Sequence, residues 1–179
     1  RPGDSTVYAQ HAFAVYPLAT QERGGIGIEV PAVAYGHDLP AMRAAITPTT
    51  RIVFVANPNN PTGTWIAPAP LEAFIASVPH DVLVVLDEAY NEYLDPADRA
   101  DSNAWVRRHP HLLVSRTFSK AYGLAALRVG YGVMHAAVAD ALNRVRQPFN
   151  VNSLAQAAAL AALADTAYVD ESRALNREG

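Results

Sequence analysis

The sequence predicts an α/β fold in which a mostly parallel central sheet lies between two layers of helices. Apolar runs rich in Val and Ile alternate with longer segments of helical period, the order expected of a chain that repeatedly crosses one sheet. The run at residues 82–86 reads VLVVL without polar alternation, as in a central strand covered on both faces. Half of the 179 residues are hydrophobic and 17% are charged, so the chain can bury a core.

The expected elements follow these patterns in order along the chain. Strands are predicted for the apolar runs at residues 6–9, 27–30, 52–56, 82–86, 112–115 and 129–133. The intervening segments of helical period predict helices at 13–22, 39–45, 70–77, 102–108 and 136–146, then one long alanine-rich helix from 153 to about 176. Proline and asparagine in QPFNVNS, residues 147–153, separate the last two helices.

Composition excludes several classes of partner and site. The net charge is −3 and no basic run reaches four residues, so we expect neither nucleic acid nor an anionic membrane as partner. The absence of cysteine excludes disulfides and thiol catalysis, and the six histidines lack metal-ligand spacing, so no metal site is predicted. No apolar run approaches a membrane span and no signal-peptide pattern opens the chain, which makes a cytoplasmic protein the expectation.

Polar residues gather directly after three predicted strands. They form the segments NPNNPTG (57–63), DEAYNEY (87–93) and RTFSK (116–120). Each has a simple structural explanation when taken alone: a tight turn, a helix N-cap and a surface lysine. Ligands of open α/β sheets bind at the carboxyl ends of the strands, so the joint placement of the three segments predicts a binding site.

The chemistry of these segments points to one ligand. Prolines would hold the Asn60 amide toward it, and the Asp87 carboxylate would favour a protonated partner. Tyr90 lies three residues after Asp87, on the same face if a helix begins there. A lysine drawn out of water becomes an amine nucleophile, the role expected of Lys120. Two further residues, Ser119 and Arg128, are suited to phosphate oxygens. Pyridoxal 5′-phosphate (PLP) offers the matching ring nitrogen, phenolic oxygen, aldehyde and phosphate.

The motifs NPNNPTG, DEAYNEY and SRTFSKAYGLAALRVGYG, in this order and spacing, resemble fold-type-I PLP-dependent aminotransferases. Among these the chain is most similar to the histidinol-phosphate aminotransferases, over nearly its whole length. The resemblance implies that Lys120 binds the aldehyde covalently and serves as the catalytic acid and base. It implies that Asp87 pairs with the ring nitrogen, and that an aromatic ring at Phe13 stacks on the cofactor.

The resemblance also assigns the other contacts and the missing parts. Asn60 and Tyr90 would contact the phenolic oxygen, and Ser119 and Arg128 the phosphate. Residues 1–150 would form a PLP-binding large domain that lacks its N-terminal part, and 151–179 a helix leading to an absent small domain. A substrate-binding arginine, part of the phosphate cup and a tyrosine from the partner subunit would lie in absent segments, so we expect this chain to be an inactive fragment of a homodimeric enzyme.

The expected reaction is transamination of histidinol phosphate, with 2-oxoglutarate as amino acceptor, in histidine biosynthesis. Two alternatives keep the cofactor: a phosphothreonine-type decarboxylase and an aromatic aminotransferase. A third alternative, from a different class, is a non-catalytic module that binds PLP or a partner subunit. The sequence favours an enzyme over such a module, since Lys120, Asp87 and Arg128 are all intact. The residues that would discriminate between the PLP enzymes lie largely in the absent segments.

Overall fold

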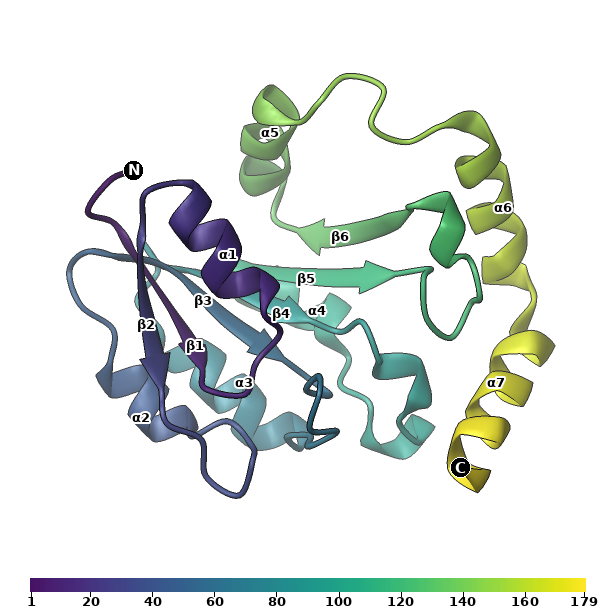
Figure 1. Ribbon diagram of the computed structural model, residues 1–179, viewed down its shortest axis with the longest axis horizontal. Coiled ribbons are helices and arrows are strands. Elements are labelled where there is room, and N and C mark those ends of the chain that lie inside the picture. Colours follow the sequence, from purple (N-terminus) through teal and green to yellow (C-terminus); the bar gives the residue numbers. More distant parts are fainter.

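The computed structural model describes residues 1–179 and contains one six-stranded sheet. The strand order is β2-β1-β3-β4-β5-β6, and five of the strands run in the same direction (Figure 1). The strands are β1 (Ser5–Ala9), β2 (Ile26–Val30), β3 (Thr50–Ala56), β4 (Leu83–Asp87), β5 (Leu112–Thr117) and β6 (Gly130–Met134). All six predicted strands are therefore present, and the predicted α/β class is confirmed.

The register of the central strands aligns their carboxyl ends. Ala56 at the end of β3 pairs with Asp87 at the end of β4, and Asp87 pairs with Ser115 of β5. The last strand, β6, runs antiparallel to β5 and pairs Ser115 with Gly132. Consequently, the segments that follow β3, β4 and β5 all emerge at one edge of the sheet.

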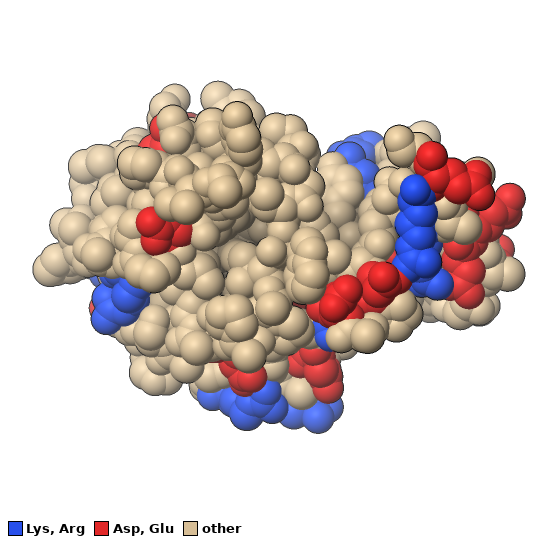
Figure 2. All heavy atoms as spheres, turned by 90° about the horizontal axis from the view of Figure 1, so that it is seen from below, with Lys and Arg blue, Asp and Glu red and all other residues tan.

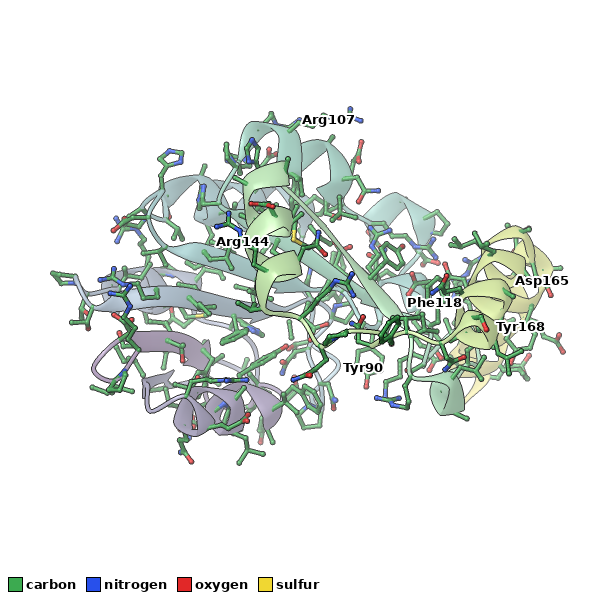
Figure 3. All side chains as sticks on the ribbon, turned by 90° about the horizontal axis from the view of Figure 1, so that it is seen from above. Tyr90, Arg107, Phe118, Arg144, Asp165 and Tyr168 are labelled. Atoms are coloured by element: carbon green, nitrogen blue, oxygen red, sulfur yellow. The ribbon has the colours of Figure 1, made fainter.

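Helices cover both faces of the sheet. They are α1 (Val15–Glu22), α2 (Leu39–Ala44), α3 (Pro68–Ser77), α4 (Ser102–Arg108), α5 (Ala136–Val145), α6 (Ser153–Ala164) and α7 (Thr166–Glu178). In Figures 1 and 3, α1 lies on one face of the sheet and α4 on the opposite face, with α2 and α3 on the α4 side. This is the predicted three-layer arrangement.

The main core lies between the sheet and the helices. It consists of 17 buried residues, among them Val53, Val84 and Val114 from the three central strands, each with no exposed surface. A smaller cluster joins Phe118 and Val129 to Ala155 and Ala159 of α6. Figure 3 shows Phe118 between the end of the sheet and the C-terminal helices. One face of the alanine-rich helix α6 is thus packed against residues at the end of the sheet.

The predicted single helix from 153 to 176 is wrong, because the chain breaks into α6 and α7 at Asp165. The backbone of Asp165 leaves the helical region (φ −90°, ψ 71°), and its Oδ1 accepts a hydrogen bond from Tyr168 N at 3.1 Å. A side chain that caps the next helix competes with continuation of the preceding one. Figure 3 shows Asp165 and Tyr168 close together at this junction.

The face seen in Figure 2 carries few charges over the body of the domain. Acidic and basic side chains gather instead toward the C-terminal helices and along the lower edge of the domain, and most basic residues in this view lie beside acidic ones. Arg177 of α7 forms an ion pair with Asp95. None of the helices combines the length and the apolar character needed to cross a membrane.

Candidate active site

A hollow lies at the carboxyl ends of β3 and β4. Five of the seven predicted site residues line it: Phe13, Asn60, Asp87, Tyr90 and Lys120. They come from segments up to 107 positions apart (120 − 13), which the parallel register brings to one edge of the sheet. Tyr16, Ala56, Pro58 and Ala89 complete the lining. The structure therefore brings most of the predicted site together.

Asp87, the last residue of β4, is held by both carboxylate oxygens. Its Oδ1 accepts a hydrogen bond from the backbone N–H of Ala89 at 3.1 Å, and its Oδ2 accepts one from the Tyr16 hydroxyl at 2.8 Å. No α-helix begins after Asp87; only a 3-10 turn forms, at Asn91–Tyr93. The helix that would have placed Tyr90 on the same face as Asp87 is therefore absent, although Tyr90 does line the same hollow.

Of the three asparagines in the loop after β3, two form hydrogen bonds that hold the loop and one is left to face the hollow. Asn57 exchanges two hydrogen bonds with the backbone of Ile66, at 3.0 and 2.8 Å. Asn59 is 3% exposed and its amide donates to His11 O and Thr62 Oγ1. Asn60 makes no side-chain hydrogen bond within the chain and lines the hollow. The amide of Asn60 is thus the one of the three left for a ligand.

Lys120 lies at the mouth of the hollow, with Nζ 5.4 Å from the centroid of the Tyr90 ring. The expectation that this lysine is drawn out of water is wrong for this structure, because Lys120 is exposed. Its neighbours Phe118 and Ala121 occupy the interior positions of the loop, at 3% and 2% exposure. The apolar character of the segment comes from these neighbours, and the lysine points out between them.

Ser119 and Arg128 meet each other beside the hollow and do not line it. Arg128 Nη1 lies 3.5 Å from Ser119 Oγ and donates to the Ala125 carbonyl at 2.8 Å. Arg128 adopts a left-handed backbone conformation with φ 54°. This conformation is uncommon for a residue with a β-carbon, and it turns the guanidinium back toward the loop that carries Lys120. The predicted phosphate-binding pair is therefore adjacent in space.

Phe13 and Tyr16 form the aromatic side of the site. Their rings meet edge to face with centroids 6.0 Å apart, and Tyr16 stacks on Phe54 at 4.5 Å. Phe13 is 41% exposed and Tyr16 only 5%. Sequence reasoning missed Tyr16, although the three-residue spacing from Phe13 placed both rings on one side of a helical segment.

Burial and charge set the protonation of two groups close to the hollow. Burial, reinforced by the charge of Asp87, raises the pKa of Tyr16 far above its ordinary value, so the hydroxyl remains a donor. Burial lowers the pKa of His37 to about 4, and its neutral Nε2 accepts a hydrogen bond from Ala56 N at 3.3 Å. The end of β3 is therefore supported by an uncharged imidazole.

Comparison with known proteins agrees with the geometry. The chain is 66% identical to "Histidinol-phosphate aminotransferase 1" of Cupriavidus pinatubonensis over 99% of its own length and 47% of that relative. It is 64% identical to "Histidinol-phosphate aminotransferase 2" of Pseudomonas aeruginosa, over 99% of the chain and 48% of the relative. The chain thus spans about half the length of the curated relatives it matches.

Solved structures share the fold. Histidinol-phosphate aminotransferase from Sinorhizobium meliloti, solved in complex with pyridoxal-5′-phosphate, superposes with a TM-score of 0.91 at 34% identity, covering 97% of this chain and 47% of that one. L-threonine-O-3-phosphate decarboxylase from Porphyromonas gingivalis gives a TM-score of 0.81 at 24% identity, over 93% of this chain and 49% of that one, a likeness of fold alone. The family model for aminotransferase class I and II matches residues 1–178. The predicted family is confirmed: the chain belongs to the class I and II aminotransferases.

Proposed function

We propose that this chain is the cofactor-binding part of a PLP-dependent aminotransferase that converts histidinol phosphate in histidine biosynthesis, with 2-oxoglutarate as amino acceptor. The observation that carries the proposal is the single hollow in which Lys120, Asp87 and Asn60 meet. An amine, a carboxylate and an unpaired amide complement the aldehyde, ring nitrogen and phenolic oxygen of PLP. The names of relatives at 64–66% identity support the choice of substrate.

The residues present fit this cofactor by the chemistry of their side chains. Asn60 has an amide that no group of the chain occupies, and Tyr90 adds a hydroxyl to the same lining. Arg128 and Ser119, in contact beside Lys120, offer a guanidinium and a hydroxyl for the phosphate. Phe13 leaves part of its ring exposed at the hollow, where it could stack on the pyridine ring.

When bound, PLP supplies an electron sink for the pair of electrons left at the substrate's α-carbon. Lys120 would hold the cofactor through its Nζ and then carry the proton taken from that α-carbon. The negative charge of Asp87 would favour a protonated ring nitrogen. The exposure of Lys120 leaves its amine accessible to both cofactor and substrate.

The wider assembly is part of the same proposal. We place residues 1–150 in a large domain, and 151–179 at the start of a connection to a small domain. We further propose a homodimer that acts in the cytoplasm. The relatives are about twice as long as this chain, which leaves room for a small domain and for the remaining substrate contacts.

The test uses the full-length natural protein that contains residues 1–179. The protein is incubated with PLP and reduced with borohydride, and its peptides are analysed by mass spectrometry. We expect the adduct on Lys120 and its loss in Lys120→Ala. An adduct that survives at this site in the variant, or that forms only elsewhere in the wild type, would contradict the assignment. The matched control is Arg107→Lys, which adds an exposed amine on α4, outside the hollow, and should leave the adduct on Lys120.

A second measurement separates the reactions. Histidinol phosphate, which has no carboxyl group to lose, is added with 2-oxoglutarate. In parallel samples phosphothreonine or an aromatic amino acid replaces histidinol phosphate, and the products are followed. Transamination yields a keto product and glutamate without CO2, whereas decarboxylation of a suitable amino acid releases CO2. A protein that binds PLP but forms no product with any of these substrates would be a non-catalytic module. If aromatic amino acids are better amino donors than histidinol phosphate, the protein is an aromatic aminotransferase.

A further inference from the structure

Tyr16 is fixed more firmly than any other aromatic residue of the hollow. Its ring lies parallel to that of Phe54, with an interplanar angle of 4°. Its backbone carbonyl accepts a hydrogen bond from the Thr20 hydroxyl at 2.8 Å, within the helix that carries it. With only 5% of its surface exposed, the side chain has no room to swing away. A hydroxyl held this way can orient a neighbouring group.

The neighbour that this hydroxyl orients is Asp87. The Tyr16 hydroxyl donates to Asp87 Oδ2 at 2.8 Å, while Ala89 N occupies Oδ1. Since burial keeps Tyr16 protonated, the bond has one direction, from tyrosine to carboxylate. A hydrogen bond donated to a carboxylate stabilises its charged form and is roughly twice as strong as a neutral one. Tyr16 thus acts on the charge and on the orientation of Asp87 together.

We infer that Tyr16 is a positioning residue, whose hydroxyl holds the Asp87 carboxylate charged and aimed at the ring nitrogen of the cofactor. The inference rests on the proposed function, because it requires PLP in the hollow. Tyr16 need not touch the reacting atoms. Its contribution passes through a single bond to Asp87, which separates this role from the stacking expected of Phe13.

The test compares two ligands in the full-length natural protein. One is PLP, and the other is its analogue in which a C–H group replaces the ring nitrogen and so cannot pair with Asp87. For Tyr16→Phe we expect the affinity for PLP to fall about tenfold, the size of one hydrogen bond to a charged group. The affinity for the analogue should stay within about twofold, since its binding does not use the ring nitrogen.

Tyr8→Phe is the matched control. Tyr8 is 6% exposed and belongs to the same buried cluster as Tyr16, but its hydroxyl makes no hydrogen bond to a side chain. This variant should leave both affinities unchanged. An equal loss of both ligands in Tyr16→Phe would show a purely structural role and overturn the inference. Unchanged binding of PLP in that variant would overturn it as well.

Two further variants test whether Tyr16 acts through Asp87. In an Asp87→Asn background, Tyr16→Phe should cause no further loss of preference for PLP over the analogue, and a further loss would contradict action through Asp87. If Tyr16→Phe does not fold, 3-fluorotyrosine at position 16 keeps the ring and donates more strongly. The preference for PLP should then rise; no rise would refute the role.

The relative affinity of the wild type for PLP and for the analogue tests the proposed pairing of Asp87 with the ring nitrogen separately from the role of Tyr16. If it binds PLP no better than the analogue, pairing of Asp87 with the ring nitrogen fails, and the role of Tyr16 fails with it. If the wild type prefers PLP and Tyr16→Phe keeps the whole preference, the proposed function stands and only the inference is overturned.

Discussion

Glu88 and Arg116 form a buried ion pair that joins the chain after β4 to β5. Arg116 Nη2 lies 2.7 Å from Glu88 Oε2, and the Ser102 hydroxyl donates to the same oxygen at 3.0 Å. The side chain of Arg116 is 17% exposed and that of Glu88 is 3% exposed. Side chains of successive residues leave a strand on opposite faces, so Asp87 turns toward α1 and Glu88 toward α4. The ion pair therefore anchors the strand end that carries Asp87.

Glu88→Gln should destabilise the protein by about 3 kcal/mol, because it leaves the buried Arg116 guanidinium without its countercharge. Urea unfolding followed by circular dichroism measures the change. Asp140→Asn is the control, since it breaks an ion pair with Arg144 in which both side chains are mostly exposed, and should cost less than about 1 kcal/mol. Equal costs for the two variants would contradict the stabilising role of the buried pair.

The neutral state of His37 predicts a loss of stability in mild acid. The folded protein keeps this imidazole neutral down to a pKa of about 4, whereas the unfolded chain takes up a proton below about pH 6.5. The unfolded state therefore binds more protons in this window, and the contribution of His37 is full above pH 6.5 and falls as the pH drops toward 4. His37→Gln should flatten the measured stability between pH 6.5 and 4 relative to wild type, and an unchanged slope would refute the assignment.

Gly123 and Gly63 give a matched pair of glycines with the same φ of 69°. A β-carbon on Gly63 would meet no atom within 4 Å, whereas one on Gly123 would collide with the Tyr168 hydroxyl. Gly63→Ala should cost about 1 kcal/mol through backbone strain alone, and Gly123→Ala somewhat more, because the half-exposed Tyr168 ring must also move aside. In a Tyr168→Ala background the cost of Gly123→Ala should fall to that of Gly63→Ala. Persistence of the excess cost would argue against this contact between α7 and the loop.

Asn59 and Asn60 should separate stability from ligand binding. Asn59→Ala removes a buried amide with two hydrogen bonds and should destabilise the fold by about 1–3 kcal/mol. Asn60→Ala removes an amide with no partner in the chain, so it should leave the urea midpoint almost unchanged and weaken PLP binding several-fold. Fluorescence titration with PLP measures the second effect. A loss of stability without a loss of affinity in Asn60→Ala would remove this residue from the proposed site.

Asp87→Asn should reduce turnover more than it reduces PLP binding. The amide keeps the size of the carboxylate and can still accept the Tyr16 bond, but it carries no charge to favour a protonated ring nitrogen. Single-turnover kinetics and PLP affinity in the full-length natural protein measure the two effects. Unchanged single-turnover kinetics would rule out the proposed electrostatic role of Asp87.

The strands and most of the site were predictable because they depend on local patterns. An uninterrupted apolar run such as that ending at Leu86 has to be covered on both faces, and the polar residues after it lie at a sheet edge. The break at Asp165 was missed because the surrounding alanines favour a continuous helix, while one capping side chain ends it. The hydrogen bond between Tyr16 and Asp87 joins residues 71 positions apart, a distance at which no local pattern operates.

The position of Lys120 has a consequence for spectroscopy. It is the only lysine among residues 1–179, and its Nζ lies 5.4 Å from the centre of the Tyr90 ring. Reductive methylation with ¹³C-formaldehyde would place a methyl signal on this nitrogen. The magnetic field of the tyrosine ring would shift the Lys120 resonance away from that of a free lysine, and any movement of the side chain would change the shift. One NMR line would then report in solution on the entrance to the hollow.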